Sequence, residues 1–222
     1  MRFVYHAQAG APSLSIEGEA YRHLFKARRI RKENALHLRN LKDDFLYTYR
    51  IETLDRRRAV LALEEETPLR IAPEKTLHLG WCLIDPKSIE KALPSLNEIG
   101  VAQITFFHCA RSQRSFRPDF ERWERIVLRS CEQCGRSVRM RLRQVPELAD
   151  FLAEEPQAHL LDFSSRRLGC AEGPEALVVG PEGGFEAQER ARFPMERILG
   201  LGTASILRSE TAVCAAAARI LL

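Results

Sequence analysis

The feature that most constrains the fold is a change in hydrophobic periodicity near residue 70. Between residues 35 and 66, apolar and polar residues alternate, as in ALHLRN, FLYTYRIETL and RRAVLALEEE. Beyond residue 75, continuous apolar runs alternate with segments of helical periodicity. Alternation is typical of strands with one solvated face, and continuous apolar runs are typical of buried parallel strands. The segment TPLRIAPEK (67–75) carries two prolines between the two patterns, so we expect one domain over 1–70 and another over 75–222.

The front part is predicted to be a small, mostly β barrel. Its three alternating runs, 35–40, 45–54 and 57–66, are separated by turn sequences and predict three antiparallel strands. The segments RFVY and LSIEG predict two further short strands. Residues 19–30 instead place Tyr21, Leu24 and Phe25 at helical spacing, which predicts a short amphipathic helix.

The back part is predicted to be an α/β layer fold. Its apolar runs are TLHLGWCLI, QITFFHC, HLLDFS, ALVVG and RILGLG, with helical segments among them. One helix is expected over 119–135, and an Ala-rich helix is expected to close the chain over 211–222.

The composition indicates where the protein is located, whether its cysteines are reduced and whether it binds a metal. No apolar run approaches the length of a membrane span and the first residues do not resemble a secretion signal, so we expect a cytoplasmic protein without a membrane partner. Six cysteines in a chain of 222 residues are expected to be reduced thiols. Cys131 and Cys134 form a CxxC on the apolar stripe of a predicted helix, which favours core packing over metal binding, and no metal is expected.

Two basic stretches indicate a nucleic-acid partner. Residues 22–58 hold twelve Lys or Arg against five acids, and residues 111–143 hold ten Arg against four acids. Such stretches, with aromatic residues among them, are typical of proteins that lie along phosphates, although an ordinary solvated surface of mixed charge is the alternative. The residues predicted to bind RNA are Arg22, Lys26, Arg28, Arg29, Arg111, Arg114 and Arg136.

The sharpest local motif is ALVVGPEGGFEAQE (176–189), a buried strand that runs into a glycine loop and then a helix. Glycine lets backbone amides approach a ligand closely. The loop matches neither common nucleotide fingerprint, and Glu182 within it would repel a polyphosphate. A cationic or zwitterionic ligand such as S-adenosylmethionine would tolerate that acid, and a plain strand-to-helix turn is the alternative.

A second motif, RILGLGTASILRSETAVCAAAARIL (197–221), adds another glycine-containing strand end before the last helix. The combination of GPEGGF with ILRSETA resembles the RsmE family of SPOUT methyltransferases, which methylate ribosomal RNA of the small subunit at uracil N3. Three further segments are similar to family motifs: NEIGV (97–101), RSQRS (111–115) and RWERIVLRSCEQCGR (122–136). The resemblance covers essentially the whole chain.

The resemblance implies a PUA-like barrel followed by a trefoil-knotted SPOUT α/β methyltransferase domain that forms a homodimer. It also implies a bent S-adenosylmethionine among three loops and 16S ribosomal RNA, or the small ribosomal subunit, as the partner. The cofactor-binding residues that it implies are Leu161, Gly180, Pro181, Glu182, Gly183, Gly184, Leu199, Gly200, Leu201, Gly202, Ile206 and Leu207.

The chain departs from the family at two places. Two lysines that the family often carries correspond roughly to Asp85 and Ser95, and Pro94 is expected to interrupt that helix. The family sequence Gly-Pro-Arg-Ile-Leu-Arg is replaced by GTASILR, which is one residue longer through Thr203 to Ser205.

Methylation at uracil N3 requires loss of the imide proton and stabilisation of charge on the base. Arg208 is the predicted stabiliser of that charge, and Glu210 is predicted to accept the proton or to orient Arg208. A structural ion pair between the two is the alternative reading. A knotted enzyme acting on another RNA and a non-catalytic ribosome-assembly factor are the alternative functions.

Overall fold

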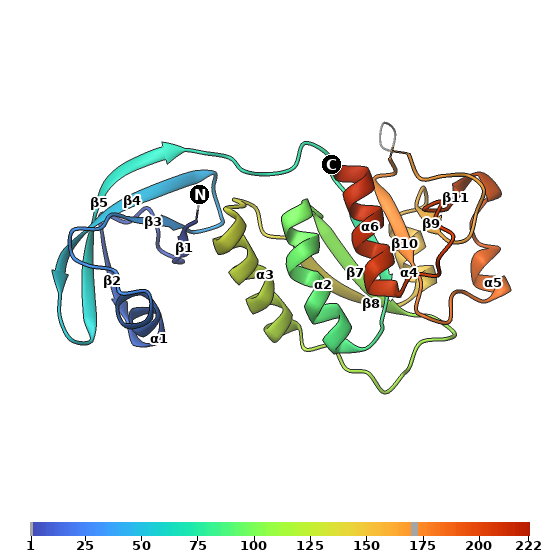
Figure 1. The fold of residues 1–222 in the computed structure, drawn as a ribbon, viewed down its shortest axis with the longest axis horizontal. Coiled ribbons are helices and arrows are strands. Elements are labelled where there is room, and N and C mark those ends of the chain that lie inside the picture. Colours follow the sequence, from blue (N-terminus) through green and yellow to red (C-terminus); the bar gives the residue numbers. More distant parts are fainter. Residues whose placement is uncertain (1, 170–172) are drawn as a thin grey trace. The chain divides into compact units, whose positions relative to one another are not determined.

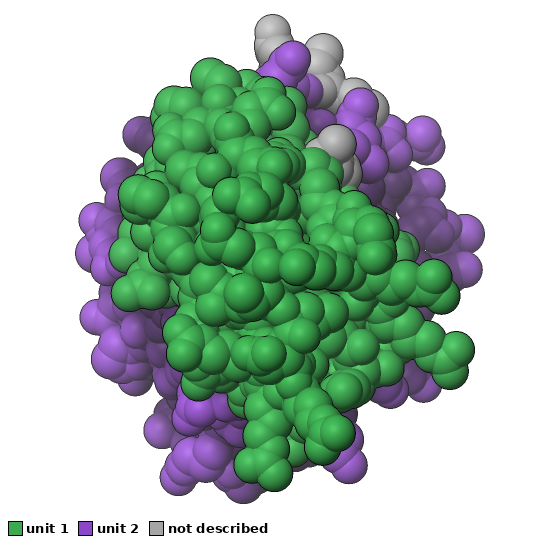
Figure 2. Space-filling model, turned by 90° about the vertical axis from the view of Figure 1, so that its left-hand side faces the viewer, with its two compact units in different colours: residues 1–72, 131–138 green, residues 73–130, 139–222 purple. Residues whose placement is uncertain are grey.

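The computed structural model describes residues 2–169 and 173–222, so Cys170 lies outside the described residues. The chain forms two compact units, coloured separately in Figure 2. Unit 1 contains residues 1–72 and 131–138, and unit 2 contains residues 73–130 and 139–222. The short segment 131–138 therefore groups with unit 1, although it lies within the sequence range expected for the second domain.

Unit 1 is built on a five-stranded sheet in the order β1-β3-β4-β5-β2 (Figure 1). The pair β1–β3 is parallel and the other pairs are antiparallel. The strands are β1 (Val4–Tyr5), β2 (Ser13–Glu17), β3 (Leu36–Arg39), β4 (Phe45–Leu54) and β5 (Arg58–Pro68). The three predicted antiparallel strands are confirmed, since alternate residues such as Leu38, Tyr49 and Leu61 are fully buried.

The predicted helix over 19–30 is shorter and less regular than expected. Helix α1 (Gly18–Tyr21) continues as a wider π-helical segment, η1 (Arg22–Ala27). Tyr21, Leu24 and Phe25 are buried in the core of unit 1, as their spacing predicted, while Arg22 is exposed. The apolar residues therefore hold this segment on the sheet and leave its basic residues in solvent.

Unit 2 is built on a six-stranded parallel sheet in the order β11-β9-β10-β6-β7-β8. Its strands are β6 (His78–Cys82), β7 (Gln103–His108), β8 (Arg141–Glu147), β9 (His159–Leu161), β10 (Ala176–Val179) and β11 (Ile198–Leu199). Its helices are α2 (Pro86–Ile99), α3 (Phe120–Cys134), α4 (Leu148–Glu154), α5 (Ala187–Arg190), η2 (Met195–Arg197) and α6 (Ser209–Leu221); the last residues of α3 group with unit 1.

Helices cover both faces of this sheet. Figure 1 shows α2 between α3 and α6, and side-chain contacts place α3 and α6 over Trp81 and Phe106. Helix α4 covers the opposite face, because Phe151 packs against Phe107 and the backbone of Gly80. Successive residues of a strand point to opposite faces, so the apolar runs of β6 and β7 fill both layers.

The structure differs from the expectation at two elements of unit 2. Strand β8 was not expected, because its sequence RLRQVPE is mostly polar and exposed at the edge of the sheet. Pro94 does not interrupt α2, which runs through it. Proline within a helix removes a backbone hydrogen bond and crowds the preceding turn, which together cost about 3 kcal/mol. Burial of Leu93 and Leu96 on either side of Pro94 helps to hold the helix across this position.

The expectation of reduced cysteines was also wrong at one pair. Cys82 at the end of β6 and Cys109 just after β7 form a disulfide. The ends of adjacent parallel strands bring these two cysteines together, and their spacing in the sequence does not predict the disulfide. Cys131 is buried and Cys134 is half-buried. In the described part of the chain, no group of His, Cys, Asp and Glu is arranged to hold a metal ion. No helix there has both the length and the apolar character needed to cross a membrane.

Candidate functional site

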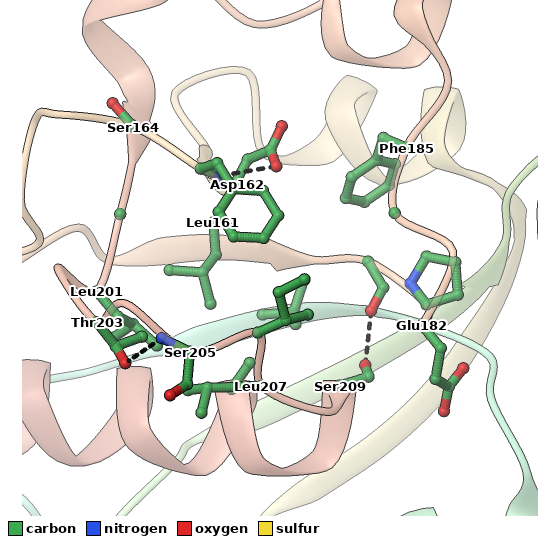
Figure 3. Close-up of a pocket in the computed structure, with 18 of the residues that line it drawn as sticks. Leu161, Asp162, Ser164, Glu182, Phe185, Leu201, Thr203, Ser205, Leu207 and Ser209 are labelled. Carbon is green, nitrogen blue, oxygen red and sulfur yellow. Dashed lines mark hydrogen bonds between the residues drawn. The ribbon is translucent and has the colours of Figure 1, made fainter.

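A pocket of about 340 Å³ opens at the carboxyl ends of β9 and β10 and beside β11 in unit 2 (Figure 3). The ends of parallel strands lie at one edge of a sheet, and loops that follow them are the usual position of a ligand site in α/β folds. Three loops form the pocket, at 161–164, 180–185 and 200–207, and the first turn of α6 completes it. Figure 3 shows Asp162 and Phe185 on one side, with Leu207 and Ser209 on the other.

The pocket brings together almost all of the residues predicted to hold a cofactor. Those that line it are Leu161, Gly180, Pro181, Glu182, Gly183, Gly184, Gly200, Leu201, Gly202, Ile206 and Leu207. Leu199 is the exception. It lies buried in β11, and its carbonyl accepts a hydrogen bond from the backbone N–H of Asp162 at 2.9 Å. Leu199 therefore holds the first loop in place without lining the pocket.

Several lining residues were not predicted, among them Phe163, Ser164, Phe185, Thr203 and Ser209. Phe163 follows the apolar strand β9, yet 73% of it is exposed. Ile206 is also exposed, at 82%. Exposed apolar side chains at the mouth of a pocket provide surface for the flat or aliphatic parts of a ligand.

Glycine is required at two positions in these loops. Gly184 has φ +68°, a left-handed conformation that other residues rarely adopt. A Cβ at Gly200 would lie 2.5 Å from the carbonyl oxygen of Ser164, because the two loops run in contact there. The backbone N–H of Gly200 also donates to Arg166 at 2.8 Å, which fixes this approach.

Ser209 connects the terminal helix to the glycine loop. Its hydroxyl donates a hydrogen bond to the carbonyl of Gly180 at 2.6 Å (Figure 3). The same hydroxyl accepts a hydrogen bond from Trp81 Nε1 at 2.9 Å. Trp81 is fully buried on β6 and Ser209 is 4% exposed, so this chain of bonds is shielded from water. The start of α6 and the end of β10 are thereby held at a fixed separation.

Two carboxylates lie at the pocket and differ in their environment. Asp162 forms an ion pair with Arg190 of α5 at 2.9 Å, so its charge is balanced within the protein. Glu182 is exposed in the glycine loop, and no ion pair forms on it among the described residues. Its negative charge is therefore available to a cationic group of a ligand.

Arg208 and Glu210 flank Ser209 at the start of α6. Arg208 is exposed at the N-cap, and Glu210 is half-buried in the first turn, with its Oε2 atom shielded from solvent and without a hydrogen-bond partner among the described residues. Neither residue lines the pocket. Arg208 and Glu210, both within the described residues, form no ion pair with each other, which was the alternative reading. Burial, and then Glu210, raise the pKa of the nearby Cys214 thiol.

The residues predicted to bind RNA divide into exposed and buried groups. Those that are exposed are Arg22, Lys26, Arg28, Arg29, Arg111 and Arg114. Arg136 is 5% exposed, and burial lowers the pKa of its guanidinium. Arg39, which contributes to the first basic stretch, is 1% exposed and donates to the carbonyls of Phe45 and Leu69. Arg136 is therefore buried, and its side chain is not presented to phosphates in solvent.

Comparison with known proteins shows the class of protein to which the chain belongs. An RNA methyltransferase domain matches residues 72–221, and an RNA methyltransferase PUA domain matches residues 16–64. The chain is thus built as an RNA methyltransferase with a PUA domain.

Ribosomal RNA small subunit methyltransferase E from Helicobacter pylori strain J99 is 43% identical over 96% of both chains. The enzyme of the same name from Aquifex aeolicus is 24% identical over 84% of both chains. The chain belongs to the ribosomal RNA small subunit methyltransferase E family.

Solved structures agree in fold. Ribosomal RNA small subunit methyltransferase E from Neisseria gonorrhoeae, bound to S-adenosylmethionine, has a TM-score of 0.80 at 22% identity and covers 98% of this chain and 96% of its own. A candidate methyltransferase from Legionella pneumophila, in complex with the same cofactor, has a TM-score of 0.78 at 25% identity and covers 98% and 96%. The predicted PUA-like front and SPOUT α/β back are confirmed.

Proposed function

We propose that this protein transfers the methyl group of S-adenosylmethionine to N3 of a uracil in 16S ribosomal RNA. The observation that carries the proposal is the pocket formed by three loops at the strand ends, in a chain of the ribosomal RNA small subunit methyltransferase E family. Both H. pylori relatives, at 43% and 41% identity, carry that enzyme's name.

The residues at the pocket fit S-adenosylmethionine. Its volume of about 340 Å³ falls within the range of small-molecule sites. Around Gly184 the space is open, since a Cβ there would meet no atom within 4 Å. Leu161, Ile206 and Leu207 offer apolar surface for an adenine, and Glu182 offers a charge opposite to the ligand's cationic groups. The cofactor supplies an electrophilic methyl group.

The chain's own contribution to the chemistry is proposed for the start of α6. Ser209 lines the pocket, and we infer that its neighbours in the chain, Arg208 and Glu210, lie close to the reacting base. Arg208 is exposed and is proposed to stabilise the negative charge that develops on the uracil. Glu210 has an acceptor atom without a partner among the described residues, and it is proposed to take the N3 proton.

The RNA is proposed to lie along the exposed basic residues of each unit. Arginine is suited to forked phosphate contacts, and the basic residues of η1 and of the segment after β7 are exposed. RNA affinity should then fall steeply with salt, with a linear relation between the logarithms of affinity and salt concentration. We further propose a PUA-like domain over 1–70, a methyltransferase domain over 75–222 with a trefoil knot, a homodimer, and action in the cytoplasm on the small ribosomal subunit or its RNA.

Mass spectrometry of 16S ribosomal RNA from cells that lack the gene tests the proposal. Loss of one methyl mark on a uracil, restored by the wild-type gene and not by an Arg208→Ala variant, is expected. A complete set of marks in the deletion strain would refute the function. Calorimetry with S-adenosylmethionine separates the enzyme from a non-catalytic assembly factor, which would bind none, and a mark lost from another RNA would identify a different substrate.

A further inference from the structure

We propose that Arg111 is a positioning residue that holds the glycine loop in its ligand-binding conformation. This inference rests on the proposed cofactor site. It differs from the role expected from the sequence, in which Arg111 is one of several arginines that contact RNA phosphates. The segment concerned is 109–117, which follows β7, and it contacts the loop that follows β10.

The central contact is a hydrogen bond from Arg111 Nη1 to the carbonyl oxygen of Gly183, with a separation of 2.6 Å. A charged donor makes such a bond stronger than one between neutral groups. The residue at the other end has no side chain, and a Cβ at Gly183 would point at Arg111, 3.3 Å from its Cδ atom. The next nearest atoms to that Cβ, at 3.5 and 4.0 Å, also belong to Arg111. A Cβ at residue 183 would therefore crowd the arginine side chain and require it to shift by a few tenths of an ångström.

The segment that carries Arg111 is itself anchored at two residues, Cys109 and Ala110. The backbone N–H of Ala110 donates to Glu189 Oε1 at 2.9 Å. The other carboxylate oxygen of Glu189 caps the start of α5 by accepting from the N–H of Glu186 at 2.9 Å. Cys109 is joined to β6 by its disulfide with Cys82. Arg111 is thus presented to the glycine loop from a base that is fixed to the central sheet.

The neighbouring arginines lack this contact. Arg117 donates to the carbonyls of Arg114 and Phe116 within its own segment. Arg114 is exposed, and its side chain makes no hydrogen bond or ion pair in residues 2–169 and 173–222. Within one short basic segment, Arg111 therefore faces the glycine loop while Arg114 faces solvent. This difference provides a matched pair of substitutions.

The experiment compares Arg111→Ala with Arg114→Ala in the full-length protein. Calorimetry with S-adenosylmethionine alone should show about a tenfold loss of affinity for Arg111→Ala, the scale of losing one hydrogen bond from a charged donor at an exposed site. Arg114→Ala should keep its cofactor affinity and lose RNA affinity. In turnover assays Arg111→Ala should raise KM for the cofactor and leave kcat at saturation and the melting temperature nearly unchanged. Unchanged cofactor affinity in Arg111→Ala, with reduced RNA affinity, would overturn the inference.

A double-mutant cycle with Gly183→Ala gives an independent test. If the new methyl group acts by displacing Arg111, Gly183→Ala should weaken cofactor binding in the wild-type background and add little in the Arg111→Ala background. Full additivity of the two losses would overturn the positioning role. The proposed function fails by separate results: a wild-type protein that binds no S-adenosylmethionine, or a complete set of methyl marks in the deletion strain.

Discussion

Replacing Ser209 by alanine tests how the terminal helix holds the pocket together. The substitution removes the donor to Gly180 and leaves Trp81 Nε1 without its acceptor, in a place where Trp81 is fully buried. A buried donor without a partner costs about 1 to 3 kcal/mol, and the second bond adds about 1 kcal/mol. We therefore expect the free energy of unfolding to fall by about 3 kcal/mol. For a chain of this size, the melting temperature should fall by roughly 6 to 12 °C.

Thermal and denaturant melts followed by circular dichroism measure this effect, and Ser205→Ala is the matched control. Ser205 also lines the pocket, but it is exposed, so its truncation should change stability by less than about 0.5 kcal/mol. Because Ser209 positions Gly180, Ser209→Ala should also weaken binding of S-adenosylmethionine. If Ser209→Ala melted within about 1 °C of Ser205→Ala, the proposed connection between α6 and the glycine loop would contribute nothing to stability.

Three further outcomes are expected. Arg208→Ala should lower single-turnover rates roughly a hundredfold with little change in cofactor affinity. Glu210→Gln should give a pH-dependent loss of rate. Full activity in Glu210→Gln, together with a lower melting temperature in Glu210→Ala, would show that Glu210 has a structural role only. Gly200→Ala should destabilise the protein by about 2 kcal/mol in denaturant melts, since its Cβ would overlap a backbone oxygen, and an unchanged midpoint would contradict the close approach of the two loops. Burial first, and then Arg197, lower the pKa of His159 below its ordinary value of 6.5. The stability that comes from neutral His159 is present above pH 6.5 and is lost as pH falls through the lowered folded value, so His159→Gln should flatten the acid side of a plot of melting temperature against pH.

The architecture was predictable where it depends on local pattern. Alternation in residues 45–54 and 57–66 is enough to predict β4 and β5, because one face of each strand packs on a core and the other meets solvent. The apolar runs of β6, β7 and β10 likewise predict buried parallel strands. The glycine loop was identified from its own residues, and Gly184 has the positive φ that glycine permits. Almost all of the predicted cofactor residues reach the pocket because strand ends of a parallel sheet share one edge.

What the sequence by itself determined is thus most of the strands and helices, and the loops that follow the strands of the pocket. Only the tertiary structure decided which distant residues meet. Ser209 contacts Trp81 across 128 positions and Arg111 contacts Gly183 across 72, and neither separation has a periodic signature. The burial of Arg136, the Cys82–Cys109 disulfide and the edge strand β8 are of the same kind. The physical reason is that hydrophobic periodicity reports which face of an element is buried, whereas partners across the sheet depend on strand order and on the path of the chain between strands.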